Sequence, residues 1–292
     1  MSWPPPSGDP VPLPPPTETH APTPPRAAPP SGESPVSQVR EADYLGCPVT
    51  VDIARGRGVV LVRPRWGLWD AVATLLASIG LSIIVVGAVA AVAILQGRSA
   101  GDLTGGEILL SIVLPWIGLA GWPLLATATR GNGPRIDLGL RLSWRDVGLG
   151  AAGGVAAIMV GALLAGVTIA VFGEIDSAAA EVAEDLLRQG DRWMLITMAL
   201  LVLMGAPIVE EIAFRGMVYN SAAKRGWVPW VTIPVSALAF ALFHFEPQRL
   251  IILFGIGVVL GIVRWKVRSL GACMVAHGVN NLPSAIYIAT LS

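Results

Sequence analysis

Few ionisable side chains lie in the C-terminal third of this sequence, and their types and spacing suggest chemistry. Two adjacent carboxylates, Glu210 and Glu211, follow a long uncharged run, and Arg215 comes four residues after the second. His244 and His277 lie within or at the end of later apolar runs. Ionisable side chains at membrane depth are rare and by default indicate function. A carboxylate beside neutral imidazoles can hold and deprotonate a water molecule, so hydrolysis is the chemistry that these residues predict.

Helical spacing gives the two glutamates different surroundings. Glu211 and Arg215 are four residues apart, which places them on one helix face at the separation of an ion pair. Glu210 is rotated by about 100° from its neighbour and is left without a partner on its own helix. We therefore expect Arg215 to neutralise Glu211, and Glu210 to face the histidines.

The other polar residues also occur at helical spacing. His277 and Asn281 are four residues apart and project from one face of the last helix, and Phe240 and His244 share a face in the same way. Glu210 and His244 each lie about 24–27 Å along their helices from the turn between them, at a rise of ~1.5 Å per residue. These positions allow one cluster of a glutamate, two histidines and an asparagine.

Such a cluster permits two kinds of catalysis. The histidines and Asn281 can donate hydrogen bonds to a developing oxyanion while Glu210 acts as the base. Alternatively, Glu210, His244, His277 and Asn281 bind a divalent metal such as zinc. An amide is not an ideal zinc ligand, and the chain has no H-E-x-x-H motif. Metal dependence stays open from the residues alone.

The rest of the chain predicts a membrane bundle that positions these residues. The composition is 53% hydrophobic and only 14% charged, outside the usual balance of a soluble globular protein. The formal net charge is zero, which gives no reason to expect nucleic acid as a partner. Uncharged runs occupy residues 71–95, 108–129, 147–173, 193–209, 226–243, 250–263 and 269–292. Since about 20 apolar residues cross a bilayer, we predict an all-α polytopic bundle of about seven transmembrane helices, with six or eight as alternatives.

Charge and composition complete the predicted topology. Most Lys and Arg residues near the ends of the runs fall on the side of the N-terminus, so the positive-inside rule places the N-terminus in the cytoplasm. We predict three regions. Residues 1–66 form a disordered Pro-rich cytoplasmic tail and linker, 67–190 form N-terminal transmembrane helices, and 191–292 form the core that carries the polar cluster.

Three motifs in this last region resemble those of a known family. "EEIAFRG" at 210–216 matches the pattern E-E-x-x-x-R, "FALFH" at 240–244 matches F-x-x-x-H, and "HGVNN" at 277–281 matches H-x-x-x-N. In this order they resemble the CPBP family of integral-membrane peptidases, the CAAX prenyl protease and bacteriocin-processing group, which includes the type II CAAX endopeptidases. The resemblance covers about residues 190–292, so this region looks like a CPBP catalytic core.

The resemblance implies an intramembrane endopeptidase and a role for each matching residue. Glu210 looks like the family's catalytic glutamate, which activates water for attack on a peptide carbonyl, and His244 looks like its partner. His277 and Asn281 look like the pair that completes the water-binding and oxyanion site. The supporting residues are Glu211, Arg215 and Phe240. The family is described both as metal-dependent and as glutamate-dependent, so a bound zinc ion stays an alternative.

The resemblance also implies the partners and the location. The substrate is a membrane-associated protein or peptide, prenylated in the CAAX case or related to bacteriocins in other members. The chain is then a multi-pass protein of a cytoplasmic-type membrane and contacts the lipid bilayer. Two alternatives from other functional classes are a non-catalytic membrane scaffold or immunity protein and a proton-coupled transporter. No inverted repeat relates the two halves of the chain, which argues against the transporter.

Overall fold

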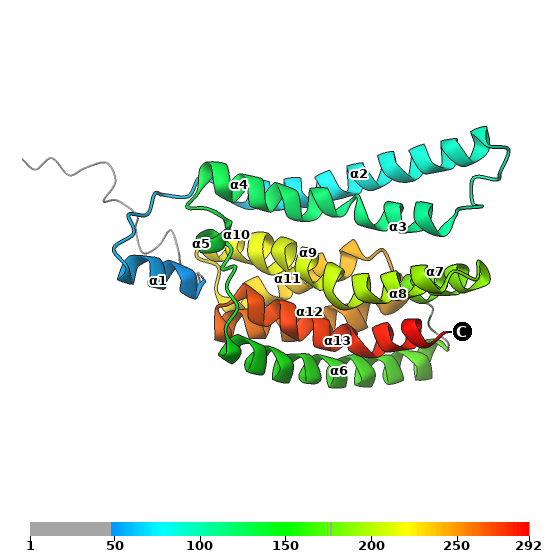
Figure 1. Cartoon of the computed structure of the whole chain (residues 1–292). Coiled ribbons are helices and arrows are strands. Elements are labelled where there is room, and N and C mark those ends of the chain that lie inside the picture. Colours follow the sequence, from blue (N-terminus) through cyan, green and yellow to red (C-terminus); the bar gives the residue numbers. More distant parts are fainter. Residues whose placement is uncertain (1–47, 174, 176, 292) are drawn as a thin grey trace, which may run out of the picture. The chain divides into compact units, whose positions relative to one another are not determined.

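The computed structural model describes residues 48–173, 175 and 177–291, and the Pro-rich tail predicted over the first part of the chain lies outside these residues as far as residue 47. In the part of the chain that is described, every regular element is a helix, which confirms the all-α prediction (Figure 1). The side of the membrane on which the N-terminus lies stays a prediction.

The predicted uncharged runs are all helical. Five helical segments of the described residues are long and apolar enough to cross a membrane: Leu68–Leu95, Gly105–Arg130, Trp144–Phe172, Arg192–Lys224 and Pro247–Val267. Two further helices complete the bundle, the shorter apolar α11 (Pro229–Phe243) and α13 (Leu270–Thr290). The polar residues His277, Asn280 and Asn281 make α13 less apolar than the five candidate spans. The structure is therefore a polytopic helical bundle.

The first two spans differ in regularity. Helix α2 (Leu68–Leu95) is continuous, whereas the next span is divided into α3 (Gly105–Val113), the π-helix η2 (Ile117–Gly121) and α4 (Trp122–Arg130). The two spans pack closely, because a Cβ on Gly118 would lie 2.5 Å from the backbone nitrogen of Ser78. The short helix α5 (Pro134–Asp137) follows and leads to α6 (Trp144–Phe172).

Residues 48–66, which we expected to be linker, contain the helix α1 (Val49–Gly56). Its residues Val51 and Ala54, three apart on one helical face, are buried. The backbone N–H of Val49 donates to the carbonyl of Arg268, in the turn between α12 (Leu250–Val267) and α13. This helix therefore packs on the core that follows much later in the chain.

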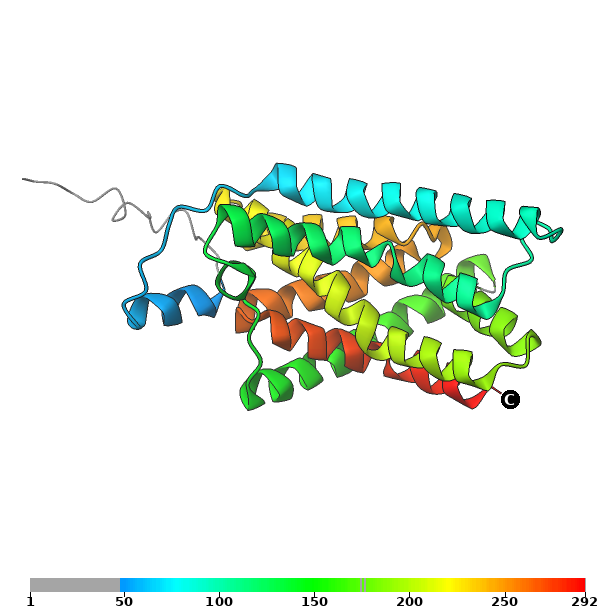
Figure 2. The same cartoon turned by 45° about the horizontal axis from the view of Figure 1, so that its top comes forward.

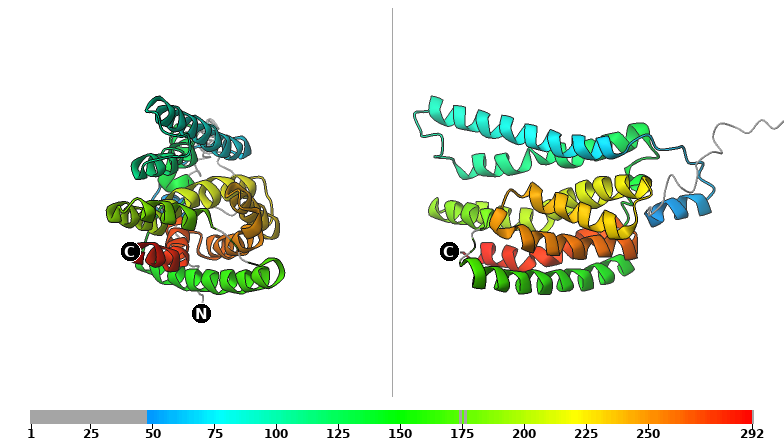
Figure 3. Two further views of the ribbon diagram at one scale, coloured as in Figure 1. Left: turned by 90° about the vertical axis from the view of Figure 1, so that its right-hand side faces the viewer. Right: turned by 180° about the vertical axis from the view of Figure 1, so that it is seen from behind.

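Helix α13 packs along α6 and also contacts α12 (Figure 3). A Cβ on Gly150 of α6 would lie 2.6 Å from the carbonyl oxygen of Ala272, and one on Gly154 would lie 2.5 Å from the Cβ of Val279. Small residues let membrane helices approach closely in this way. This close approach fixes the rotation of α13 about its axis, and with it the direction in which His277 points.

The span that carries the two glutamates is interrupted twice. It consists of α8 (Arg192–Leu200), η3 (Leu201–Gly205), α9 (Ala206–Glu211), η4 (Ile212–Val218) and α10 (Tyr219–Lys224), where η3 and η4 are π-helices. Helix α7 (Ala178–Arg188) precedes it. Pro207 cannot donate a backbone hydrogen bond, which explains why the helix departs from α geometry beside it. Figure 2 shows this span, coloured yellow-green, crossing the bundle obliquely.

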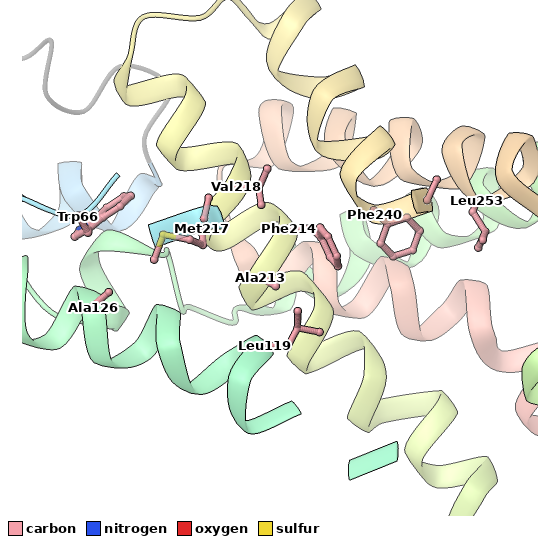
Figure 4. Packing of buried hydrophobic residues seen from close by; sticks show 11 residues of the cluster. Trp66, Leu119, Ala126, Ala213, Phe214, Met217, Val218, Phe240 and Leu253 are labelled. Atoms are coloured by element: carbon pink, nitrogen blue, oxygen red, sulfur yellow. The ribbon is translucent and has the colours of Figure 1, made fainter. Parts of the chain in front are cut away.

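The π-helix η4 is the centre of the largest buried cluster. All of its residues are buried, and Phe214 packs edge-to-face on Phe240 with ring centroids 5.4 Å apart. Figure 4 shows these rings together with Met217, Val218 and Leu253. The cluster also includes residues of the first spans, so the N-terminal helices pack directly on η4, which follows the two glutamates in the same span.

Candidate active site

Glu211 and Arg215 form the ion pair that their spacing predicts. Arg215 Nη1 donates to Glu211 Oε1 at 2.8 Å, and both side chains are fully buried, with 0% exposed. The same carboxylate oxygen lies 2.9 Å from His277 Nδ1. An ionised carboxylate can only accept hydrogen bonds, so we assign the hydrogen of His277 to Nδ1. Glu211 therefore orients His277 as well as pairing with Arg215, a second contact that helical spacing cannot predict because it joins α9 to α13.

The imidazole of His244 is held in the same tautomer by a different partner. His244 is the residue that follows α11, and its Nδ1 lies 2.8 Å from the carbonyl oxygen of Phe240. A carbonyl oxygen accepts only, so Nδ1 carries the hydrogen here too. In both histidines Nε2 is thus the nitrogen with the free lone pair.

Glu210 faces both of these nitrogens. Its Oε2 atom lies 3.9 Å from His244 Nε2 and 3.8 Å from His277 Nε2. Oε2 is buried, and within the described residues it has no hydrogen-bond partner. The two nitrogens are acceptors as well, so neither contact has a donor, and both separations are too long for a direct hydrogen bond. Buried acceptors are normally satisfied by a donor, and a water molecule carries two O–H donors.

Phe240 is the buried ring that both histidines contact. It lies with its centroid 4.7 Å from that of His244 and 5.6 Å from that of His277. The guanidinium carbon of Arg215 lies 4.7 Å from the centre of the same ring. Phe240 thus packs against both imidazoles and offers its face to the cation that neutralises Glu211.

Asn281 is placed differently from the other predicted site residues. Its Nδ2 donates to the carbonyl oxygen of Val202 at 3.0 Å, and its Oδ1 accepts from Asn280 Nδ2. Val202 belongs to η3, the π-helix that precedes α9. The structure therefore joins Glu210, Glu211, His244 and His277 in one cluster, and it places the amide of Asn281 on the backbone that leads to them.

The residues that surround this cluster from α11 and α12 were not identified by the sequence patterns. Ser236 Oγ donates to the carbonyl oxygen of Phe214 at 2.9 Å, and Arg215 Nη2 donates to the carbonyl of Gly257 at 2.9 Å. Both bonds connect η4 to a neighbouring helix. A serine or glycine inside an apolar run gives no signal of such a contact until the helices are docked.

The possibility of a metal site can be tested against the same geometry. Within residues 48–173, 175 and 177–291, no group of three or more His, Cys, Asp or Glu side chains is arranged so that it could hold a metal ion. The two Nε2 lone pairs have suitable donor chemistry, and their Nδ1–H groups are oriented by oxygen atoms as in many metal sites. Asn281 donates through Nδ2 to Val202, and its Oδ1, the atom that would bind a metal, accepts from Asn280. A divalent metal held by Glu210, His244, His277 and Asn281 stays a prediction.

An apolar pocket of about 600 Å³ lies between α13 and the span Arg192–Lys224, which carries the glutamates. It reaches α9 at Pro207 and Ile208, close to Glu210 in the chain, and α13 at Gly278, next to His277. The remaining lining residues are Leu140, Arg141, Leu142, Leu203, Met204, Gly271, Met274, Val275, Val279 and Leu282. Arg141 is the charged member of an otherwise apolar lining.

Comparison with protein families identifies the segment that carries this cluster. Residues 192–283 match the family model described as type II CAAX prenyl endopeptidase Rce1-like. The matched segment includes all three motifs, which confirms the resemblance to the CPBP intramembrane peptidases. No curated protein and no solved structure matches the chain.

Proposed function

We propose that this chain, whose residues 192–283 match the type II CAAX prenyl endopeptidase Rce1-like family model, hydrolyses a peptide bond of a membrane-associated protein or peptide. One observation carries the proposal: Glu210 Oε2 is buried, has no hydrogen-bond partner among the described residues, and faces the Nε2 atoms of His244 and His277 at 3.9 and 3.8 Å. A general base needs this kind of unsatisfied acceptor within reach of the proton that it takes.

In the proposed reaction, a water molecule donates one hydrogen to Glu210 Oε2 and the other to an imidazole Nε2. Its oxygen attacks the carbonyl carbon of the substrate, and a C–O bond forms while the proton passes to Glu210. The C–N bond then breaks, and Glu210 returns this proton to the departing nitrogen. General base catalysis of this kind contributes about 10²–10⁴-fold to a rate.

The remaining residues orient the groups that react. Glu211 accepts from Nδ1–H of His277, which leaves the lone pair of Nε2 for the water, and Arg215 donates to the same oxygen of Glu211. A primary amide has two N–H donors, and Asn281 uses one of them on Val202. We propose that its second N–H stabilises the oxyanion that forms on the substrate carbonyl.

Cleavage of membrane peptides by the purified protein in bilayers tests this function. We expect the wild type to convert peptides from a membrane-peptide library into fragments that mass spectrometry identifies. Binding of peptides without any fragment would instead support the scaffold or immunity function. Proton flux across proteoliposomes without cleavage would support the transporter.

The metal alternative makes a different prediction, which a chelator can test. A bound divalent metal would supply Lewis-acid activation of the water, with Glu210, His244 and His277 as the candidate ligands. The general-base reaction proposed above uses no metal, so it predicts that cleavage continues at the same rate after treatment with EDTA or 1,10-phenanthroline. Loss of activity that added Zn²⁺ restores would contradict this expectation.

The apolar pocket beside α9 suggests where the hydrophobic part of the substrate lies. We propose that a prenyl group on the substrate occupies it, as the name of the matched family suggests. Met204 lines this pocket and is 57% exposed, so a larger side chain can fill the space without disturbing the buried core. We expect Met204→Trp to raise KM for a prenylated peptide about tenfold, in the range that apolar pockets discriminate, and to leave KM for the unprenylated peptide unchanged. Equal effects on both peptides would exclude this pocket as the prenyl site.

A further inference from the structure

Arg264 is a buried cation in a membrane-spanning helix, although its place at the end of an apolar run suggests an interfacial anchor. Only 1% of its surface is exposed. Its Nε donates to the carbonyl oxygen of Arg215 at 3.2 Å, and its Nη2 donates to Asn220 Oδ1 at 2.9 Å and to the carbonyl oxygen of Leu138 at 3.3 Å. Buried charges in membrane helices are energetically costly, so this position needs an explanation.

We infer that Arg264 is a positioning residue for the active site, which it influences through the π-helix η4; this inference rests on the proposed function. π-helical turns are rare and occur frequently at functional sites. The glutamates lie on α9, between two such turns, so the geometry of these turns sets the direction in which both carboxylates point. Whatever holds the turns therefore positions Glu210 and Glu211.

Side chains from three neighbouring helices bind backbone carbonyls of these two turns. Asn281 of α13 binds Val202 in η3 at 3.0 Å. Ser236 of α11 binds Phe214 in η4 at 2.9 Å, and Arg264 of α12 binds the next residue, Arg215. In a membrane, polar side chains of neighbouring helices satisfy the backbone groups that irregular turns leave free. His244 follows α11, and His277 lies on α13. The hydrogen bonds from Ser236 and Asn281 therefore fix the glutamates relative to these histidines.

A continuous series of contacts runs from Arg264 to the reacting groups. Arg264 holds the backbone of Arg215, whose side chain donates to Glu211 Oε1 at 2.8 Å. Glu211 Oε1 in turn lies 2.9 Å from His277 Nδ1, and His277 Nε2 faces Glu210 at 3.8 Å. If the carbonyl of Arg215 moves, its guanidinium and Glu211 must move with it. His277 then loses the partner that fixes its tautomer.

The shape of the arginine side chain suits this task. A guanidinium offers several N–H donors in a fixed planar fork, so one side chain can bind Arg215, Asn220 and Leu138 together. A lysine carries a point charge on a flexible stem and cannot reproduce this geometry. We therefore expect Arg264→Lys to keep the cation but to hold η4 less firmly, and Arg264→Met to release it.

Steady-state cleavage by the full chain in bilayers provides the first test. We expect Arg264→Met to lower kcat about 10–100-fold, as substitutions of residues that orient catalytic groups do, with KM nearly unchanged and an intact melting transition. Arg264→Lys should lie between this variant and the wild type. Lys266→Met, which removes a cation two residues further along the same helix, is the matched control and should leave kcat unchanged. If Arg264→Met fails to fold, Arg264→Lys alone decides the outcome.

The tautomer of His277 gives a second readout that does not depend on activity. The chain has three histidines, so ¹⁵N imidazole NMR of the full protein can be assigned by substituting each in turn. We expect Nδ1–H for His277 in the wild type and a mixture of tautomers in both Arg264 variants. Unchanged His277 signals would overturn the inference, whether or not kcat falls. A perturbed His277 in a chain that cleaves no peptide would retain the positioning role and reject the proposed peptidase.

Discussion

Glu210→Gln should lower the rate of peptide cleavage by about a thousandfold, within the range that general bases contribute, while the protein remains folded. The substitution keeps the shape of the side chain but removes its ability to accept a proton. It also changes the balance of donors and acceptors, because the new amide can donate to the Nε2 atoms of His244 and His277. In the wild type these atoms face a buried carboxylate oxygen that has no partner within the described residues.

The stability of this variant separates catalysis from structure. A buried acceptor without a partner destabilises the folded state by about 1–3 kcal/mol, so Glu210→Gln should melt at the same temperature as the wild type or higher. Activity lost together with stability would indicate a structural role for Glu210 and would contradict the assignment of the base. Glu181→Gln makes the same chemical change at an exposed position of α7, and it should change neither cleavage nor melting.

The helical bundle follows from the sequence because long apolar runs leave few alternatives in a membrane. Backbone groups in lipid must be paired within the segment, so an uncharged run of sufficient length becomes a helix. Spacing likewise predicts contacts within one helix, such as the pair of Glu211 and Arg215, which the structure confirms. The approach of Glu210 to His244 and His277 was also expected, since these residues lie at compatible positions along neighbouring helices.

The contacts between different helices could not be predicted from the spacing of residues in the sequence. The bond between Glu211 and His277 depends on how α13 is rotated, and α13 is held by contacts with glycines of α6 such as Gly150. Periodicity cannot reveal the π-helix η4 that follows Glu211, because its backbone carbonyls bind side chains such as Ser236 and Arg264 from other helices. For the same reason Arg264 resembled an interfacial anchor in the sequence although it is buried.

Between residues 48 and 66 the sequence predicted less regular structure than the protein has. Its composition suggests a linker, yet α1 forms there because Val51 and Ala54 find apolar neighbours in the folded protein. Local composition underestimates order when the burying surface is supplied by distant segments. The bond from Val49 to the carbonyl of Arg268, near the other end of the chain, is such a long-range contact.

Removal of either partner of the buried pair between Glu211 and Arg215 should destabilise the protein strongly. Arg215→Met leaves the Glu211 carboxylate buried without its cation, which we expect to reduce the free energy of unfolding by about 3–5 kcal/mol. Glu211→Gln leaves the Arg215 cation uncompensated and should have an effect of similar size. The double variant removes both charges, so most of the lost stability should return, as for other buried pairs replaced together.

A double-mutant cycle on the free energy of unfolding in detergent or bicelles measures this coupling. An exposed ion pair with the same N–O separation provides the control: Asp52 and Arg268 also approach to 2.8 Å, with 50% and 40% of their side chains exposed. Asp52→Asn should change stability by less than about 1 kcal/mol. If the Glu211 and Arg215 variants destabilised no more than this control, the pair would not be the electrostatic support that its burial indicates.

Cleavage by the double variant then shows why the pair is retained. An apolar replacement could give a core of equal stability, but the double variant holds Nδ1–H of His277 through a neutral amide oxygen instead of a carboxylate. We expect its kcat to stay about 10–100-fold below that of the wild type even where stability is restored. Recovery of full activity with recovered stability would mean that the pair supports only the fold. Stability without activity would mean that the buried charges are kept in the membrane to orient His277 for catalysis.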